Sequence, residues 1–171
     1  MKVLFVSGGR NGKAGTVVTN QGESLEKAGA AITYLVIAPG FFSYVRSVRK
    51  IRQVCRKGRF DIVHAHYGLS GMAAALASCS PLAVSLMGSD VYYTWIIRLM
   101  VRIFSRFFWD ITIVKSSQMK DISGIKDAFI LPNGVDMGRF VPMEKHVARE
   151  KLGILPDSGI ILFISAPGRL E

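Results

Sequence analysis

The sequence is poor in acidic side chains and in cysteine. Its 171 residues carry 12 Asp and Glu against 22 Lys and Arg, a formal charge of +10. The two cysteines, Cys55 and Cys79, make neither a disulfide framework nor the spacing of a metal site, a pattern that fits a protein of the reducing cytosol. Half of the residues are hydrophobic and the mean hydropathy is +0.32, which excludes a disordered or fibrous chain.

Long apolar runs are also missing. The run from Val3 to Val6 is too short for the core of a signal peptide. The longest apolar stretch, residues 95–109, is interrupted by Arg98, Arg102 and Arg106 and falls short of the roughly 20 residues that a membrane span needs. We therefore predict no spanning helix and a cytoplasmic protein.

Short apolar runs alternate with longer segments of helical periodicity, which is typical of β-α-β units on a parallel sheet. The expected strands are 2–7, 31–37, 61–65, 82–86, 110–114, 128–131 and 159–165. The expected helices are 16–28, 41–57, 68–79, 94–108, 116–121 and 146–152. Right-handed connections would join the first six strands into an α/β domain, a Rossmann-like doubly wound parallel sheet.

The composition changes after this domain. Residues 132–142 are rich in Pro, Gly, Asn and Asp, which is typical of an extended linker. We assign residues 1–136 to the Rossmann-like domain, 137–158 to a linker with a short helix, and 159–171 to the first strand of a second domain whose remainder is absent.

Candidate ligand-binding residues follow the expected strands, because ligands of such sheets bind at the carboxyl ends of the strands. The first loop, residues 7–15, contains four glycines and leads into a helix, so its amides are able to cradle a phosphate. It matches neither the Walker A nor the dinucleotide pattern, and an ordinary mobile turn is the alternative interpretation.

His64 and His66 alternate along the third strand and share one face, with His66 nearer to its carboxyl end. A metal site would need a third ligand, and the remaining histidine, His146, lies far along the chain, so we predict no metal. Two packed imidazoles are the alternative to a functional pair. After the fourth strand, Gly88, Ser89 and Asp90 form a tight polar turn suited to sugar hydroxyls, although Asp90 is equally suited to capping a helix.

Basic residues concentrate in two amphipathic helices. Residues 1–109 carry 14 basic and 4 acidic side chains, whereas residues 110–171 carry 8 of each. Such helices indicate an anionic lipid surface, nucleic acid or simply solvent, and the absence of a nucleic-acid-binding module disfavours nucleic acid. The residues that we assign to a membrane surface are Arg46, Arg49, Lys50, Arg52, Arg56, Lys57, Arg98 and Arg102.

Four segments in order resemble the amino-terminal half of GT-B-fold retaining glycosyltransferases of family 4. They are the opening strand with its glycines (3–9), Asp-Ile-Val-His-Ala-His (61–66), Ala-Val-Ser-Leu-Met-Gly-Ser-Asp (83–90) and Ile-Leu-Pro-Asn-Gly-Val-Asp (130–136), and the likeness continues through residues 149–171.

The resemblance implies transfer of a sugar from a nucleotide-diphosphate donor to a sugar or lipid-linked acceptor, with retention and without a metal or other cofactor. It places Gly8, Gly9 and Arg169 near the donor phosphates, and it implies that this half mainly holds the acceptor. We assign the acceptor cleft to His66, Tyr67, Met87, Gly88, Ser89 and Asp90.

Met87 departs from the family pattern, in which many relatives have histidine before this glycine; no catalytic residue is therefore assigned. We expect the 171 residues alone to be inactive and the protein to lie peripherally at the inner face of the membrane. A non-catalytic nucleotide- or sugar-binding module is the alternative function.

Overall fold

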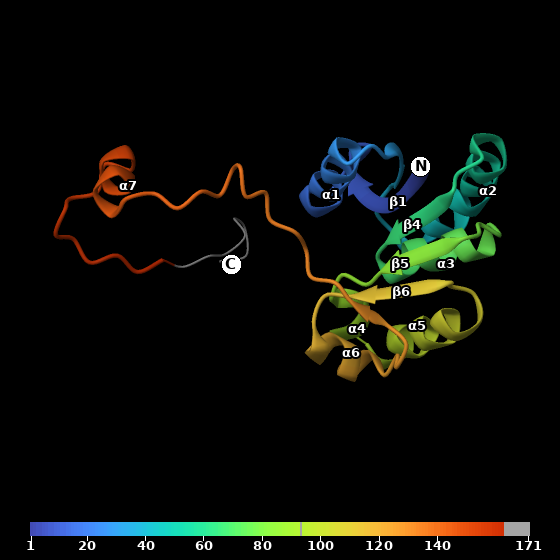
Figure 1. Ribbon diagram of the computed structural model, residues 1–171. Coiled ribbons are helices and arrows are strands. Elements are labelled where there is room, and N and C mark those ends of the chain that lie inside the picture. The colour runs from blue at the N-terminus through green and yellow to red at the C-terminus, as the bar shows by residue number, and fades with distance from the viewer. Residues whose placement is uncertain (93, 163–171) are drawn as a thin grey trace. The chain divides into compact units, whose positions relative to one another are not determined.

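The computed structural model describes residues 1–92 and 94–162, and Figure 1 shows the chain as a ribbon. Clustering of the chain's internal contacts separates two compact units, Met1–Gly134 and Val135–Glu171. The first unit contains the sheet and all but one of the labelled helices, and the second contains the short helix α7 (Lys145–Lys151).

Within the described residues the sheet has seven strands, and neighbouring strands run parallel except where β2 turns back beside β1. β3 and β4 flank β1, and β5, β6 and β7 follow β4 in that order. The strands are β1 (Lys2–Arg10), β2 (Lys13–Ala14), β3 (Ala31–Ile37), β4 (Ile62–His66), β5 (Leu82–Ser85), β6 (Ile111–Val114) and β7 (Phe129–Ile130).

Helices connect the parallel strands and cover both faces of the sheet. They are α1 (Thr16–Lys27), α2 (Phe41–Gly58), α3 (Gly68–Leu76), α4 (Ser89–Tyr92), α5 (Trp95–Phe107) and α6 (Ser117–Ser123). Among them α2 packs on α3, α3 on α5, and α5 on α6, so these four form one layer. The α/β, Rossmann-like class predicted from the sequence is confirmed.

The alternation of side chains along β1 divides the core between the two faces. Val3 and Phe5 pack with Val18 of α1, whereas Leu4 and Val6 join a larger cluster that includes Ile51 of α2. All six side chains are buried, and the strand is apolar on both faces, as expected for a central parallel strand. The layer of α2, α3, α5 and α6 therefore lies on the face opposite to α1.

Two elements were not predicted. β1 runs on to Arg10 and pairs antiparallel with β2 through a turn at Asn11 and Gly12, both of which have positive φ (52° and 72°). An Asn-Gly pair is the preferred sequence for such a two-residue hairpin turn. The helix α4 directly after β5 was also missed, because its four residues are too short to show a periodicity.

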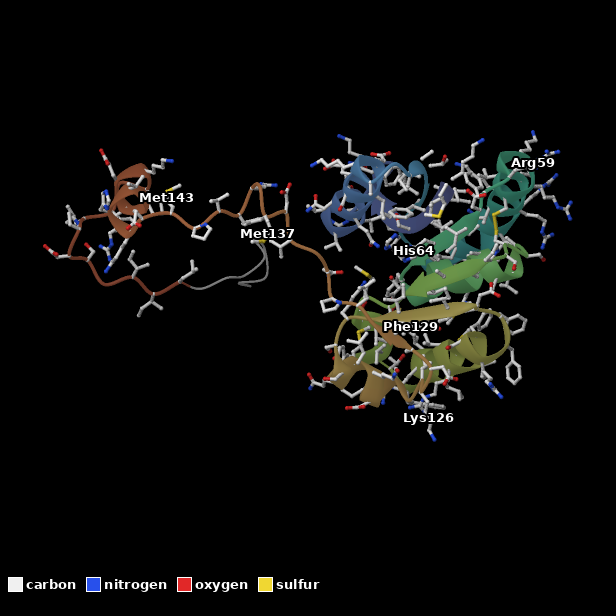
Figure 2. All side chains as sticks on the ribbon, viewed as in Figure 1. Arg59, His64, Lys126, Phe129, Met137 and Met143 are labelled. Atoms are coloured by element: carbon white, nitrogen blue, oxygen red, sulfur yellow. A yellow bond between two sulfur atoms is a disulfide. The ribbon has the colours of Figure 1, made fainter. Side chains whose placement is uncertain are left out.

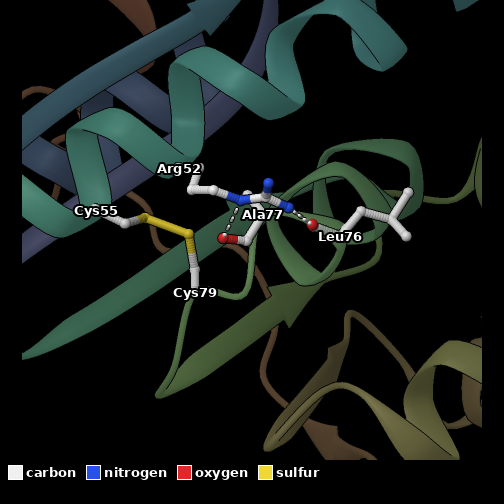
Figure 3. Close-up of a disulfide and its surroundings, with 5 residues drawn as sticks. All are labelled: Arg52, Cys55, Leu76, Ala77 and Cys79. Carbon is white, nitrogen blue, oxygen red and sulfur yellow. Dashed lines mark hydrogen bonds between the residues drawn. A yellow bond between two sulfur atoms is a disulfide. The ribbon is translucent and has the colours of Figure 1, made fainter.

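The cysteines form a disulfide, which corrects the sequence-based interpretation. Cys55 of α2 and Cys79, in the loop after α3, are bonded with their Cα atoms 6.2 Å apart (Figure 3). Beside this bond, Arg52 donates to the carbonyl oxygens of Leu76 (2.7 Å) and Ala77 (3.4 Å). Disulfides persist in oxidising compartments and are rare in the cytosol, so the cysteines no longer support a cytoplasmic placement.

In the second unit, Arg149 of α7 donates to the carbonyl oxygens of Leu155 and Ser158 and thereby holds the following turn. Residues 159–162 are not in a strand, and residues 163–171 lie outside the described residues, so the predicted strand 159–165 stays a prediction. Among the helices of the described chain, none is both long and apolar enough to cross a membrane.

Candidate functional site

Three parallel strands place polar residues side by side at their carboxyl ends. His66 of β4 is in register with Ser7 of β1 on one side and with Ser85 of β5 on the other. All three side chains are buried. This edge of the sheet is where ligands of open parallel sheets bind, and here it carries hydroxyl and imidazole groups instead of apolar side chains.

A cavity of about 470 Å³ opens at this edge. Its walls come from the end of β1, the start of α1, the first turn of α2, and the residues that follow β4 and β5. The lining residues are Ser7, Gly8, Gly15, Thr16, Val17, Val18, Tyr44, His66, Tyr67 and Met87. Its volume is in the range of small-molecule sites.

The two glycines near the end of β1, Gly8 and Gly9, have different roles, although the sequence analysis placed both near the donor phosphates. A Cβ on Gly8 would lie 2.5 Å from the hydroxyl oxygen of Tyr44, so the backbone of Gly8 is exposed to the cavity beneath this tyrosine. A Cβ on Gly9 would lie 2.0 Å from the carbonyl oxygen of Lys13, because Gly9 packs inside the hairpin. Gly8 therefore contributes to the site, and Gly9 contributes to the hairpin that shapes it.

The amino terminus of α1 also borders the cavity. Gly15 is its N-cap residue, and within the described chain no side chain caps this end. Thr16, the next residue, is the first of the helix. The unsatisfied N–H groups of a first helical turn and the positive end of the helix dipole favour an anion, so this wall is suited to a phosphate.

His64 and His66 form a stacked pair on the α1 face of β4. Their ring centroids are 4.3 Å apart, and the edge of Phe5 meets the ring of His66 at 4.6 Å. Figure 2 marks His64 inside the first unit, where its Nε2 and the hydroxyl of Ser85 are hydrogen-bonded at 2.9 Å. His66 is only 2% exposed, and both of its ring nitrogens lack a hydrogen-bond partner among the described residues.

Both imidazoles are neutral at pH 7. Burial, with a smaller contribution from the charge of Lys115, lowers the pKa of His64 to about 4. Burial, together with His64 and Lys115, lowers the pKa of His66 to about 3. A neutral imidazole has one donor and one acceptor nitrogen, and both nitrogens of His66 are buried at the wall of the cavity without a partner among the described residues.

Asp90 fixes the loops around the cavity. Its carboxylate accepts hydrogen bonds from the backbone N–H groups of Gly68 (2.9 Å), Met87 (3.1 Å) and Gly88 (2.9 Å). Burial raises the pKa of Asp90, and these three donors oppose that shift by stabilising the charged form. Asp90 thus joins the start of α3 to the loop between β5 and α4, whereas the sequence analysis considered it as a cap of the helix that follows it.

The other predicted cleft residues lie around this carboxylate. Tyr67 has a positive φ of 88°, which is rare for a residue with a side chain, and its N–H donates to the carbonyl of Ser85 at 2.8 Å. Met87 lines the cavity with Tyr67. Gly88, at φ 115°, and Ser89, the exposed first residue of α4, continue the turn. Strained backbone beside a cavity is common at functional sites.

Sequence reasoning missed Tyr44. Only the packing of α2 on the sheet brings its hydroxyl over Gly8, which no local pattern reveals. Burial raises the pKa of Tyr44, with a further contribution from Tyr67. Arg169, expected near the donor phosphates, lies outside the described residues. Within the described chain no group of three or more His, Cys, Asp or Glu is positioned for a metal.

Three of the proposed membrane-surface arginines bind helix ends. Arg52 bonds to the carbonyls at the end of α3, Arg98 donates to the carbonyl of Val91 at 3.1 Å, and Arg102 donates to the carbonyl of Ser123 at 2.5 Å. These guanidiniums are held by their own domain. The remaining residues of that set, Arg46, Arg49, Lys50, Arg56 and Lys57, are exposed on α2.

Comparison with known proteins gives one family. The profile of the glycosyl transferase 4-like domain matches residues 3–114, about two thirds of the chain. The chain is 28% identical over 142 residues to the D-inositol 3-phosphate glycosyltransferase of Actinosynnema mirum and 26% identical to that of Geodermatophilus obscurus. The matches cover 67% of this chain but 31% and 29% of those proteins, so the chain spans about a third of the length of these relatives.

Solved structures share the fold. HepE of Anabaena in complex with UDP and glucose has a TM-score of 0.60 at 15% identity, over 90% of this chain and 50% of that one. The UDP-GlcNAc 2-epimerase of Methanocaldococcus jannaschii has a TM-score of 0.54 at 16% identity, over 78% and 46% of the two chains. At these identities the likeness concerns the fold, which is the Rossmann-like arrangement described above.

Proposed function

The chain belongs to the glycosyl transferase 4-like domain family, and we propose that it is the acceptor-side domain of an enzyme that transfers a glycosyl group from a nucleoside-diphosphate sugar to an acceptor hydroxyl. The observation that carries this proposal is the cavity at the carboxyl ends of β1 and β4, where a helix amino terminus, a bare glycine backbone and the unpartnered imidazole of His66 meet.

The proposed reaction breaks the bond between the anomeric carbon and the diphosphate oxygen, and the nucleoside diphosphate leaves with the electron pair. The anomeric carbon forms a new bond to the acceptor oxygen with retention of configuration, and the acceptor proton leaves with the diphosphate or passes to solvent. Negative charge develops on the departing diphosphate, so cationic and N–H groups at that point stabilise the transition state.

In this proposal the residues of the chain bind and orient the nucleotide sugar and the acceptor. The first turn of α1 offers N–H donors to a phosphate group, and Gly8, which has no side chain, leaves room in the cavity beside that turn. His66, neutral at pH 7, forms a hydrogen bond to a hydroxyl group of the acceptor, and Asp90 holds the two loops that frame it. Arg169, outside the described residues, is proposed to neutralise the departing diphosphate. The nucleotide sugar is a co-substrate, and the proposal requires neither a metal nor another cofactor.

The relatives support the class of substrates. The two curated relatives are named for glycosyl transfer to inositol 3-phosphate, and HepE was solved with UDP and glucose. A phosphate at the start of α1 and a ring hydroxyl near His66 would suit such an acceptor, and a sugar or lipid-linked acceptor presents the same groups. Because the chain spans about a third of these relatives, we propose that the 171 residues alone do not catalyse transfer.

Transfer assays test this proposal. The 171-residue chain, and a chimera that continues it with the remaining part of the A. mirum relative, are incubated with labelled UDP-glucose and inositol 3-phosphate. We expect acceptor-dependent release of UDP by the chimera, its loss in the His66→Ala chimera, and no release by the chain alone. Transfer by the chain alone would refute the inactivity. A chimera that binds both compounds without transfer would favour the non-catalytic binding module.

A further inference from the structure

The solvent-facing side of α5 is apolar. Trp95 and Phe107, near its two ends, are 70% and 73% exposed. Four more exposed apolar side chains lie between them at helical spacing, so the apolar surface is continuous. This outer row of α5 consists of Trp95, Ile96, Leu99, Met100, Ile103 and Phe107. Contiguous apolar surface of this kind on a domain marks a contact surface, whereas single exposed apolar residues are ordinary.

The orientation of α5 is fixed, so the row cannot turn into the core. The opposite side of the helix packs in the main hydrophobic cluster, where Val101 is fully buried and Ile97 and Phe104 contact the same cluster. Arg98 and Arg102 bond to the carbonyls of Val91 and Ser123, at the ends of α4 and α6. The helix thus has two apolar sides, one inside the domain and one facing solvent.

Positive charge surrounds the outer row. Residues 91–109 contain three arginines and no acidic residue, and residues 41–60 contain seven basic residues and no acidic one. α2 and α5 lie in the same helical layer, with α3 between them (Figure 1). The exposed cations of α2 therefore lie on the same side of the domain as the outer row. They are Arg46, Arg49, Lys50, Arg56 and Lys57.

We propose that this side of the domain docks on an anionic lipid bilayer, with the outer row of α5 inserted between the headgroups and the cations of α2 against the phosphates. An apolar helix face with aromatic residues and adjacent basic residues is the composition of interfacial helices. Each Lys or Arg close to an anionic surface adds about 1 kcal/mol of attraction.

Charge complementarity selects the bilayer over a second copy of the chain. Two copies meeting through α5 would bring the basic, acid-free helices α2 and α5 of both copies together, and like charges across an interface oppose association. An anionic bilayer offers both the apolar interior that the outer row needs and the negative surface that α2 needs. The inference concerns binding and does not depend on the proposed transferase activity.

Flotation of the 171-residue protein with vesicles tests the proposal. Vesicles of phosphatidylcholine alone and of phosphatidylcholine with phosphatidylglycerol are compared at low and high salt. We expect flotation with the anionic vesicles and release by salt, because salt screens surface charge. Equal binding to both kinds of vesicle, or binding to neither, would overturn the proposal.

Variants separate the contribution of the outer row of α5 to vesicle binding from that of the cations of α2. Leu99→Glu with Ile103→Glu, both at exposed positions, should lower the partition coefficient for anionic vesicles by roughly tenfold or more. Replacing Arg49, Lys50 and Lys57 with Gln should lower this partition coefficient by a similar factor and remove its dependence on salt. The matched controls are Leu152→Glu, at an exposed apolar position directly after α7, and the Lys145→Gln and Lys151→Gln pair in α7.

Circular dichroism establishes that each variant is folded. Should the two glutamates leave vesicle binding unchanged in a folded protein, the outer row is not the docking element and the proposal fails. It also fails if the unaltered protein forms a dimer that the glutamates disrupt while neither form floats with vesicles, because the row would then bind a second copy.

Discussion

The imidazole rings of His64 and His66 lie stacked 4.3 Å apart on β4, with His66 at the cavity and His64 bonded to Ser85 behind it. Both rings are buried, and burial together with the charge of Lys115 disfavours their protonated forms and lowers their pKa values. The pair therefore supplies a neutral hydrogen-bonding group in an apolar setting, and protonation of either ring opposes folding.

The histidine pair predicts a loss of stability in mild acid. The folded pKa values, about 4 and about 3, lie below the unfolded value of 6.5. Between these limits the unfolded chain binds more protons than the folded one, so the free energy of unfolding falls as the pH falls below 6.5. Each histidine contributes about 1.4 kcal/mol per pH unit to this slope. Urea unfolding measured from pH 7 to pH 4 checks it.

The His66→Phe variant isolates the effect, because it keeps a ring in place and removes one titrating group. The slope of its free energy of unfolding against pH should be smaller by about 1.4 kcal/mol per pH unit. His146→Phe, in α7 of the second unit, is the control and should leave the slope for the first unit unchanged. A His66→Phe slope equal to that of the unaltered protein would show that His66 is charged in the folded state.

The sequence predicted the sheet well because continuous apolar runs with helical segments between them leave few arrangements. It also predicted α5, expected over residues 94–108 and observed over Trp95–Phe107, but not which side of this helix is buried. A helix with apolar residues on nearly every side does not reveal which side is buried, and this was settled by packing around Val101. The disulfide between Cys55 and Cys79 could not be predicted from the sequence either, because it depends on how α2 packs on α3.

Within the candidate site, His66, Tyr67, Met87 and Asp90 were found because they directly follow strands. The separation of Gly8 from Gly9 depends on the hairpin, and the Asn-Gly pair at positions 11 and 12 was the signal that would have predicted it. The bonds of Arg52, Arg98 and Arg102 to distant carbonyls were not accessible to a local pattern.

Alanine at Gly8 and alanine at Gly9, the two glycines near the end of β1, should lower the free energy of unfolding by different amounts. Gly9→Ala places Cβ against the carbonyl of Lys13 and should lower the free energy of unfolding by about 1–3 kcal/mol. Gly8→Ala meets only the hydroxyl end of Tyr44, which is able to move, so its cost should stay below about 1 kcal/mol. Adding Tyr44→Phe to Gly8→Ala should remove that cost. Equal losses for the two alanine variants would contradict the assigned hairpin.

Asp90 should be important for stability. Asp90→Ala leaves three backbone N–H groups without their acceptor, and we expect a loss of about 2–4 kcal/mol in urea unfolding. Asp136→Ala is the comparison, because its exposed carboxylate accepts from Gly138 and Arg139 and should cost less than about 1 kcal/mol. If the two variants lose the same stability, Asp90 does not hold the loops as described.

The disulfide should stabilise the first unit. It closes a loop of 24 residues between α2 and the end of α3, which corresponds to about 3 kcal/mol. Replacing both cysteines with serine should lower the free energy of unfolding by that amount, and a thiol assay on the unfolded, unreduced protein should detect no free thiol. Two free thiols in that assay would show that the bond does not form in solution.

In our proposal the substrate lies in the cavity between β1, α1 and β4. Titration of the ¹⁵N-labelled 171-residue protein with inositol 3-phosphate, followed by amide chemical shifts, tests it most directly. The account predicts shifts concentrated at Gly8, Thr16, Val17 and Tyr67, and their loss in His66→Ala. Shifts confined to the basic residues of α2, or no shifts with either inositol 3-phosphate or UDP-glucose, would contradict it.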